Sequence, residues 1–142
     1  MGASLLLDTH IALWLDSSNP RLAIATRDLI DRCWQDGGTI CLSAVSAWEI
    51  ALLVALGRID LDIPPRAWIE RFIRRPGIVA LPLAYQAACR SYKLRDFEHR
   101  DPGDRLLIAT AVELGCPLVT YDSRITRFAE RYGSAYGFSV AA

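Results

Sequence analysis

Apolar positions along this chain fall into short continuous runs, separated by longer amphipathic segments. The runs at 4–7, 39–42, 78–81 and 117–121 are rich in Leu, Ile and Val. Continuous apolar runs of this length are typical of strands that are covered on both faces. The alternation of such runs with helical segments predicts an α/β fold, with a mostly parallel central sheet between two layers of helices.

Turn residues mark the ends of the expected helices. Asn19-Pro20, Ser43, Pro64-Pro65 and Asp101-Pro102 are suitable helix starts, and glycines follow several of the expected ends. The expected helices cover residues 11–16, 20–35, 44–56, 65–75, 83–94, 102–114 and 123–132, and a last strand is expected at 136–140. No linker, repeat or low-complexity tract interrupts the chain, so a single domain spanning residues 1–142 is expected.

Composition limits the classes of partner. The chain has 16 basic and 16 acidic residues, whereas a domain that binds nucleic acid through its overall charge is normally basic. Any contact with nucleic acid must therefore be local. The four cysteines form no CxxC pair and lie in apolar surroundings, which favours buried free thiols and a cytoplasmic location. The apolar runs are too short for a signal peptide or a membrane span, so no membrane association is expected.

Four acidic residues stand where the surrounding pattern predicts burial. Asp8 and Asp122 end apolar strands, Glu49 is the only charged residue of its expected helix, and Asp104 opens another apolar helix. In open parallel sheets, ligands bind outside the carboxyl ends of the strands, so the four can converge there. Crowded carboxylates repel one another unless a cation is present. Oxygen ligands suit Mg²⁺ or Mn²⁺, which favours phosphodiester hydrolysis.

Each acid also has a simpler explanation. Asp8 and Asp122 suit helix N-caps or turns, and Asp104 suits the positively polarised start of its helix. Glu49 can form a capping box with Ser46. Capping alone does not explain why all four acids fall where a crevice is expected.

The acids lie in motifs that follow one another along the chain. These are Leu7-Asp8-Thr9-His10, Ser46-Ala47-Trp48-Glu49-Ile50, Asp101-Pro102-Gly103-Asp104-Arg105 and Leu118-Val119-Thr120-Tyr121-Asp122. Together they resemble the PIN domain family, and within it the VapC toxins of toxin–antitoxin pairs. The resemblance implies that Asp8, Glu49, Asp104 and Asp122 are the catalytic and metal-holding residues. The family usually has an aromatic residue where this chain has Gly103, so we expect a looser helix start but no effect on a ligand.

The same resemblance implies an activity and partners. It implies a Mg²⁺- or Mn²⁺-dependent endoribonuclease that hydrolyses RNA phosphodiester bonds as the toxin of a VapBC-type pair. It also implies a cognate VapB-like antitoxin and a homodimer. Two alternatives stay open: a catalytically weak PIN-fold module used for binding, and a metal-dependent nuclease directed at DNA.

Arginines and hydroxyls near the acidic motifs complete the expected site. Arg100, Arg105 and Arg124 flank the acidic segments and suit bidentate contacts to phosphate, although each also suits a solvated surface. More distant candidates are Arg58 and Arg127. Ser46 and Thr120 are expected to hydrogen-bond to the groups around the ion, although either also suits an ordinary helix-face or strand-end position.

Overall fold

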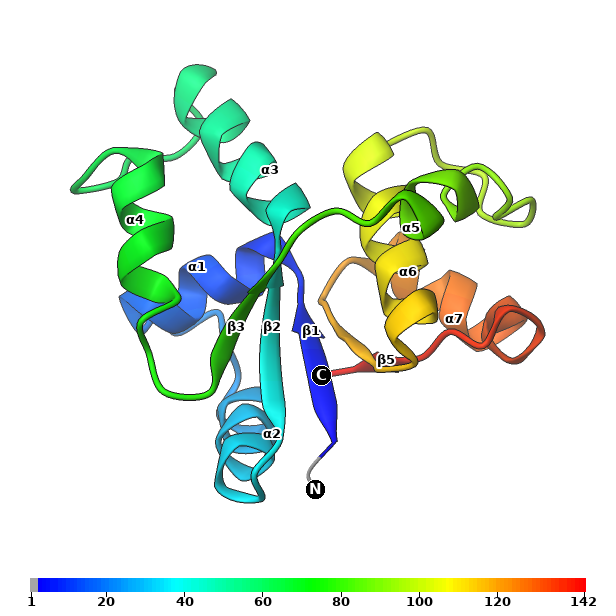
Figure 1. Ribbon diagram of the computed structural model, residues 1–142, viewed down its shortest axis with the longest axis horizontal. Helices are drawn as coiled ribbons and strands as arrows, with labels where there is room; N and C mark the ends of the chain where they lie inside the picture. Colours follow the sequence, from blue (N-terminus) through cyan, green and yellow to red (C-terminus); the bar gives the residue numbers. More distant parts are fainter. Residues whose placement is uncertain (1–2) are drawn as a thin grey trace.

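A sheet of five parallel strands forms the centre of the computed structural model, which describes residues 3–142. The strands are β1 (Ser4–Leu7), β2 (Thr39–Ser43), β3 (Ile78–Leu81), β4 (Leu118–Val119) and β5 (Val140–Ala141). Their order across the sheet is β3-β2-β1-β4-β5. The chain builds outward from β1 through β2 to β3, and then crosses back to add β4 and β5 on the other side of β1. The strand order therefore reverses between β1 and β4 (Figure 1).

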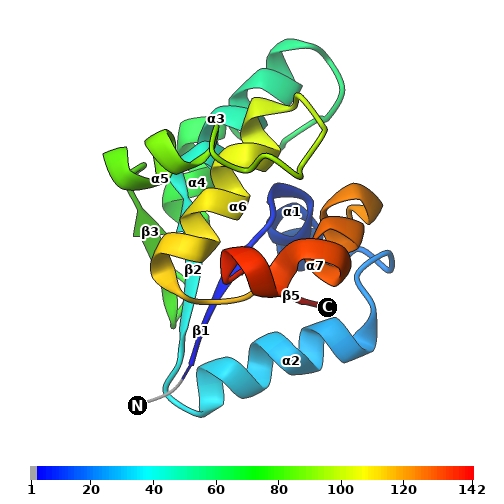
Figure 2. The same ribbon diagram turned by 90° about the vertical axis from the view of Figure 1, so that its right-hand side faces the viewer.

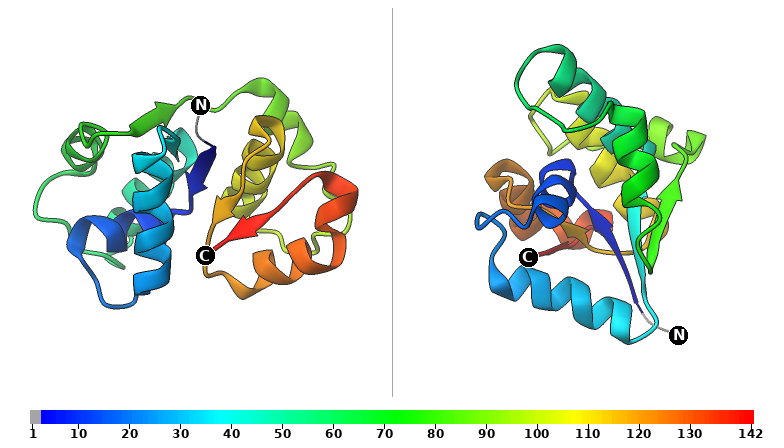
Figure 3. Two further views of the ribbon diagram at one scale, coloured as in Figure 1. Left: turned by 90° about the horizontal axis from the view of Figure 1, so that it is seen from below. Right: turned by 90° about the vertical axis from the view of Figure 1, so that its left-hand side faces the viewer.

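Helices cover both faces of this sheet. They are α1 (Thr9–Ser17), α2 (Ile24–Gln35), α3 (Ala44–Ala55), α4 (Pro65–Phe72), α5 (Tyr85–Arg90), α6 (Pro102–Leu114) and α7 (Ser123–Tyr136). The helices from α1 to α4 lie to one side, and those from α5 to α7 lie to the other (Figures 1 and 3). Figure 2 views the second group from its outer side.

Successive side chains of β1, β2 and β4 enter two separate apolar clusters. Leu6 of β1 belongs to the cluster that contains Ile108 of α6 and Phe128 of α7. Its neighbours Leu5 and Leu7 belong to the cluster formed with the helices from α1 to α4. Burial of both faces explains the continuous apolar runs, and the predicted three-layer α/β/α fold is confirmed.

Helix α2 begins at Ile24 and not at Pro20 as predicted. Asn19 closes a turn instead: its Oδ1 accepts a hydrogen bond from the amide of Arg21 (2.9 Å), and its carbonyl accepts one from the amide of Leu22 (3.0 Å). This turn brings the Leu22 side chain into the core. The predicted start was wrong because an asparagine before a proline suits a turn as well as a helix cap.

The segment predicted to be helical over 83–94 is helical only at Tyr85–Arg90. The chain then continues as a loop, whose carbonyl groups face the Arg105 side chain. The guanidinium donates hydrogen bonds to the carbonyl oxygens of Ser91, Leu94, Phe97 and His99. These contacts organise the loop in place of a longer helix.

At the C-terminal end, α7 extends to Tyr136 and the last strand is Val140–Ala141, not the predicted 136–140. Gly137 ends the helix in a left-handed conformation with φ of 67°, which favours glycine. The chain then folds back so closely that a Cβ at Gly133 would lie 2.5 Å from the carbonyl oxygen of Phe138.

All four cysteines are free thiols. Cys41 and Cys116 are buried and Cys33 is half-buried, whereas Cys89 is exposed, so the prediction of burial is wrong for Cys89. Within residues 3–142, no helix combines the length and apolar character that crossing a membrane requires.

Candidate active site

The four predicted carboxylates line one pocket at the carboxyl ends of β1 and β4, where the strand order reverses. Asp8 directly follows β1, and Asp122 follows β4. Glu49 comes from α3 and Asp104 from the first turn of α6. The pocket has a volume of about 410 Å³. Side chains from four distant parts of the sequence therefore meet in one crevice.

Both oxygens of Asp8 have partners. As the N-cap of α1, its Oδ1 accepts a hydrogen bond from the amide of Thr9 at 2.7 Å. Its Oδ2 accepts one from the Thr120 hydroxyl at 2.6 Å. Burial raises the pKa of Asp8, although the hydrogen bond from Thr120 works in the opposite direction. Thr120 is thus a direct partner of a candidate ligand.

Asp122 is held in its charged form. As the N-cap of α7, its Oδ1 accepts hydrogen bonds from the amides of Arg124 (2.8 Å) and Ile125 (3.3 Å). Burial works to raise the pKa of Asp122, but the hydrogen bonds from the Arg124 side chain and these amides outweigh it, so the pKa is lowered.

Glu49 and Asp104 are shielded from water and lie near other carboxylates. Burial, followed by the neighbouring charges of Asp8, Asp104 and Asp101, raises the pKa of Glu49 to about 7. The Glu49 Oε1 atom is buried and has no hydrogen-bond partner within the described residues. Burial, followed by the charges of Asp101, Asp122 and Asp8, likewise raises the pKa of Asp104 to about 7.

The alternative explanation of Glu49 as part of a capping box is wrong. Helix α3 begins at Ala44, and the Ser43 hydroxyl caps it by accepting a hydrogen bond from the amide of Val45 at 3.0 Å. Ser46 is therefore already inside the helix. Its Oγ lies 3.0 Å from the Thr9 hydroxyl, which donates to it. Ser46 thus supports the residue beside Asp8 and shows no hydrogen bond to the candidate ligands.

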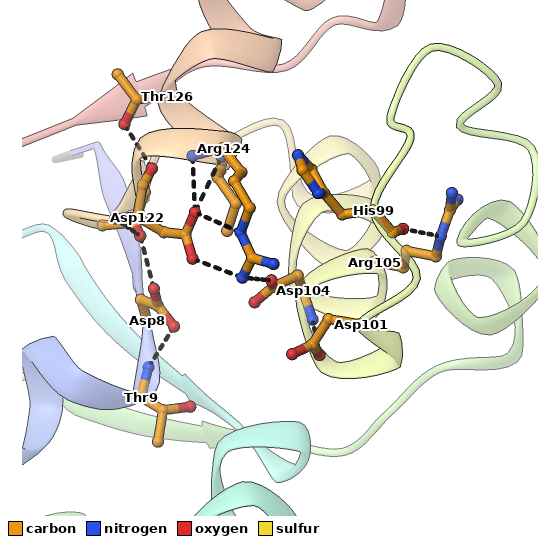
Figure 4. Close-up of polar contacts among 11 residues, drawn as sticks. Asp8, Thr9, His99, Asp101, Asp104, Arg105, Asp122, Arg124 and Thr126 are labelled. Carbon is orange, nitrogen blue, oxygen red and sulfur yellow. Dashed lines mark hydrogen bonds and ion pairs between the residues drawn. The ribbon is translucent and has the colours of Figure 1, made fainter.

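A guanidinium group lies between two of the carboxylates. Arg124 Nη2 is 3.1 Å from Oδ2 of Asp104 and 3.1 Å from Oδ2 of Asp122 (Figure 4). The hydrogen bond with Asp122 raises the pKa of Arg124, so this charge is permanent. In this arrangement, no three His, Cys, Asp or Glu side chains within residues 3–142 are grouped closely enough to hold one metal ion.

The donor set nevertheless fits a hard divalent cation. All four candidate ligands are carboxylates, which Mg²⁺ and Mn²⁺ prefer. Glu49 offers a buried oxygen that has no other partner, and burial together with the neighbouring carboxylates raises the pKa values of Glu49 and Asp104. Asp8, Glu49, Asp104 and Asp122 could hold such an ion if the Arg124 guanidinium moved aside.

Gly103 provides the space that Glu49 occupies. A Cβ at this buried position would lie 2.8 Å from Oε1 of Glu49 and 3.2 Å from Oδ1 of Asp101. The expectation that Gly103 leaves the ligands unaffected is therefore wrong, because any side chain there would displace the Glu49 carboxylate.

Arg105 does not face the pocket. Its guanidinium donates to four carbonyl oxygens of the loop that follows α5, and Figure 4 shows it directed away from Asp104. This geometry contradicts the prediction that Arg105 contacts substrate phosphate, because the guanidinium is committed to the backbone. Arg100 is exposed and does not line the pocket.

Other side chains complete the pocket. Those not assigned to the site from the sequence are His10, Ile11, Trp14, Arg21 and Tyr121. Asp101, which was expected as the cap of α6 with a weaker role around the ligands, also lines it. The Trp14 ring lies 5.8 Å, between centroids, from both His10 and Tyr121. The spacing of four residues between His10 and Trp14, directly after Asp8, was an available signal, because such residues share a helix face.

Proteins similar to this chain were found by sequence and by structure. A family model described as PIN domain matches residues 5–131. Ribonuclease VapC22 of Mycobacterium tuberculosis (strain ATCC 25618 / H37Rv) is 32% identical over 122 residues, which cover 86% of this chain and 89% of the relative.

Solved structures share the fold at lower sequence identity. VapBC2 from Rickettsia felis, bound to a DNA fragment from its promoter, matches with a TM-score of 0.67 and 12% identity over 97% of each chain. A toxin–antitoxin complex from Klebsiella pneumoniae matches with a TM-score of 0.59 and 14% identity over 96% of each chain. Because the family model spans most of the sequence and a relative is 32% identical over 86% of it, this chain belongs to the PIN domain family.

Proposed function

We propose that this chain is a Mg²⁺- or Mn²⁺-dependent endoribonuclease and the toxin of a VapBC-type toxin–antitoxin pair. The observation that carries the proposal is the convergence of four carboxylates where the strand order reverses, with a buried Glu49 oxygen that lacks a partner. A binding module gains nothing from such a repulsive cluster. The similarity to Ribonuclease VapC22 supports RNA as the substrate.

In this proposal Asp8, Asp104 and Asp122 hold the divalent cation, and Glu49 completes the oxygen set. When bound, the cation lowers the pKa of water and stabilises the charge that develops on the phosphoryl oxygens. The protein fixes the carboxylates beforehand: the Thr120 hydroxyl orients Asp8, and the first amides of α7 keep Asp122 ionised.

Two side chains act on the substrate itself. Glu49 lines the same pocket and has one buried oxygen without a partner, so its carboxylate can orient the attacking water. Arg124 carries a permanent charge beside the carboxylates and is the cation best placed to contact the phosphate.

A VapB-like antitoxin and a second copy of the chain are the proposed protein partners. The structural neighbours include a toxin–antitoxin complex, which supports the first. Light scattering of the purified chain tests the second. A homodimer has twice the 15.8 kDa mass of one chain, and a mass of 15.8 kDa at micromolar concentration would contradict it.

A cleavage assay tests the proposed activity. Labelled RNA and DNA strands of the same sequence are incubated with the chain in Mg²⁺, in Mn²⁺ and in EDTA. We expect cleavage of RNA only, with either ion, and none in EDTA. The Asp8→Asn and Asp104→Asn variants should lose at least about 100-fold in rate, because the ion supplies several kcal/mol of transition-state stabilisation.

The matched control is Asp28→Asn, which changes an exposed acid on α2 and should leave the rate unchanged. Cleavage that survives in EDTA or in Asp8→Asn would overturn the proposed site. Preferential cleavage of DNA would favour the alternative of a DNA-directed nuclease, and a stable RNA complex without cleavage would favour a binding module.

A further inference from the structure

A second pocket of about 220 Å³ lies beside the acidic one and shares Arg124 with it. It lies between α7 and the loop at 96–99. Its lining includes Phe97, His99, Arg124, Arg127, Arg131 and Tyr132. A ligand whose reacting group is in the acidic pocket can therefore continue into this one.

Three arginines of this pocket form a row on α7. Arg124, Arg127 and Arg131 are spaced three and four residues apart, which places them on one face of the helix. At a rise of 1.5 Å per residue, the row extends about 10 Å. Arg127 and Arg131 are exposed and make no ion pair within residues 3–142. Their guanidinium groups are thus free to bind an anion.

The two flanks of the acidic pocket differ in how their charges are arranged. On the α7 flank, Arg127 and Arg131 line a pocket with two carboxylates, Asp96 and Glu98, and Asp96 already accepts a hydrogen bond from the Tyr136 hydroxyl at 2.7 Å. The pocket on the opposite flank is lined by Arg21, Arg58, Asp16, Asp60 and Asp62. There, Arg71 forms ion pairs with Asp16 and Asp62, and Arg75 forms one with Asp16. The α7 flank is distinguished by its row of arginines on one helix face, and such a row attracts a polyanion locally in a chain that has no net charge.

We propose that the RNA strand leaves the cleavage site across α7, where Arg127 and Arg131 bind phosphates next to the one that is cut. Arginine suits this contact because its planar fork binds phosphate oxygens in pairs. Tyr132, which is 37% exposed, and the His99 ring offer faces on which an unpaired base can stack. This inference rests on the proposed ribonuclease function, and it adds a binding surface for single-stranded RNA.

The test measures RNA binding separately from cleavage. Fluorescence anisotropy of a labelled single-stranded RNA of mixed sequence is recorded with the Asp8→Asn protein in Mg²⁺, and a gel verifies that the RNA stays intact. In this background, Arg127→Gln/Arg131→Gln is compared with Arg66→Gln/Arg74→Gln. The second pair removes the same charge from exposed positions on and after α4. Arg58→Gln tests the opposite flank.

We expect the α7 double variant to bind RNA about tenfold or more weakly at 50 mM salt. The slope of log K against log salt should fall by about 1.4, because each phosphate contact on a single strand contributes about 0.7. The control pair should bind as the parent does, and circular dichroism should show unchanged folding in every variant.

Undiminished binding by the α7 double variant, or a larger loss in Arg58→Gln, would overturn this inference while leaving the ribonuclease proposal intact. If the parent binds no RNA and the wild-type chain does not cleave it, both proposals fall.

Discussion

Asp8 and Asp122 show that capping a helix and forming a site are compatible roles. In each, Oδ1 accepts hydrogen bonds from helix amides, while Oδ2 is directed at another group: the Thr120 hydroxyl for Asp8 and the Arg124 guanidinium for Asp122. The sequence could identify both acids but could not separate the two roles, because an N-cap aspartate leaves its second oxygen available. Glu49 was stronger evidence for a site than Asp8 or Asp122, because helix capping explained its position least well.

Replacing Thr120 tests whether the hydroxyl that holds Asp8 matters for cation binding. We expect Thr120→Val to weaken Mn²⁺ binding by about 10- to 100-fold, as is usual when a partner of a ligand is lost. Thr120→Ser keeps the hydroxyl and should retain the affinity. Calorimetric titration with Mn²⁺ gives both values. Equal affinities for the two variants would show that the hydrogen bond to Asp8 is incidental.

Glu49 and Asp104 predict a specific dependence of stability on pH. Their pKa values rise on folding from 4.5 and 3.8 to about 7, so between about pH 4 and pH 7 the folded state binds more protons than the unfolded state. The contribution of these groups to stability is therefore complete below about pH 4 and is lost as the pH rises through 7. A divalent cation needs the ionised carboxylates, so it should bind best above pH 7 and restore stability there.

Thermal unfolding in EDTA between pH 5 and pH 8 measures this effect. The Tm of the wild-type chain should fall relative to that of Glu49→Gln as the pH rises, because the variant cannot ionise at this position. Added Mg²⁺ should raise the wild-type Tm more at pH 8 than at pH 5. Parallel curves for the two proteins would contradict the raised pKa of Glu49.

At the scale of secondary-structure elements, side chains distant in sequence decide what local patterns could not. The segment at 83–94 has a helical pattern, but the helix ends at Arg90. The Arg105 guanidinium donates hydrogen bonds to backbone carbonyl oxygens in the region where the helix would have continued. Likewise, a turn at Asn19 delays α2, and α7 runs further than expected until Gly137 ends it. Elements with strong local signals, such as α3 after Ser43 and α6 after Asp101, begin where the sequence predicted.

Arg105→Gln tests the structural role of this arginine. The loop after α5 should lose its common donor, and we expect the free energy of unfolding to fall by about 2–4 kcal/mol, given the value of hydrogen bonds to charged groups. Urea unfolding measures the loss. Arg95→Gln, an exposed arginine of the same loop, should change stability little. An Arg105→Gln protein of normal stability that binds RNA poorly would restore the substrate role.

Gly103→Ala should lower activity without lowering stability. Alanine favours a helix over glycine by up to about 1 kcal/mol, so α6 should not be destabilised. The new Cβ would instead push away the flexible end of Glu49, which it would approach to 2.8 Å. We expect at least about tenfold slower RNA cleavage without a lower Tm. Cleavage at the wild-type rate would show that the position of Glu49 is not critical.

At the scale of the whole molecule, the parallel sheet brings the distant acids together. The continuous apolar runs predicted the three layers correctly because both faces of the sheet are covered. The strand order could not be derived from those runs, but acids after β1 and β4 marked the edge at which it reverses. The orientations of Arg105 and Arg124 could not be predicted, because they depend on which oxygen atoms the fold leaves in reach.

The proposed ribonuclease site depends above all on the binding of a hard divalent cation by Asp8, Glu49, Asp104 and Asp122. The most direct test is calorimetric titration of Mn²⁺ into the chain at pH 8, after treatment with EDTA and removal of the chelator. We expect saturable binding by the wild-type chain and by Asp28→Asn, and loss of that binding in Asp8→Asn and Asp104→Asn. Absence of Mn²⁺ binding by the wild-type chain, or equal binding by all four proteins, would contradict it.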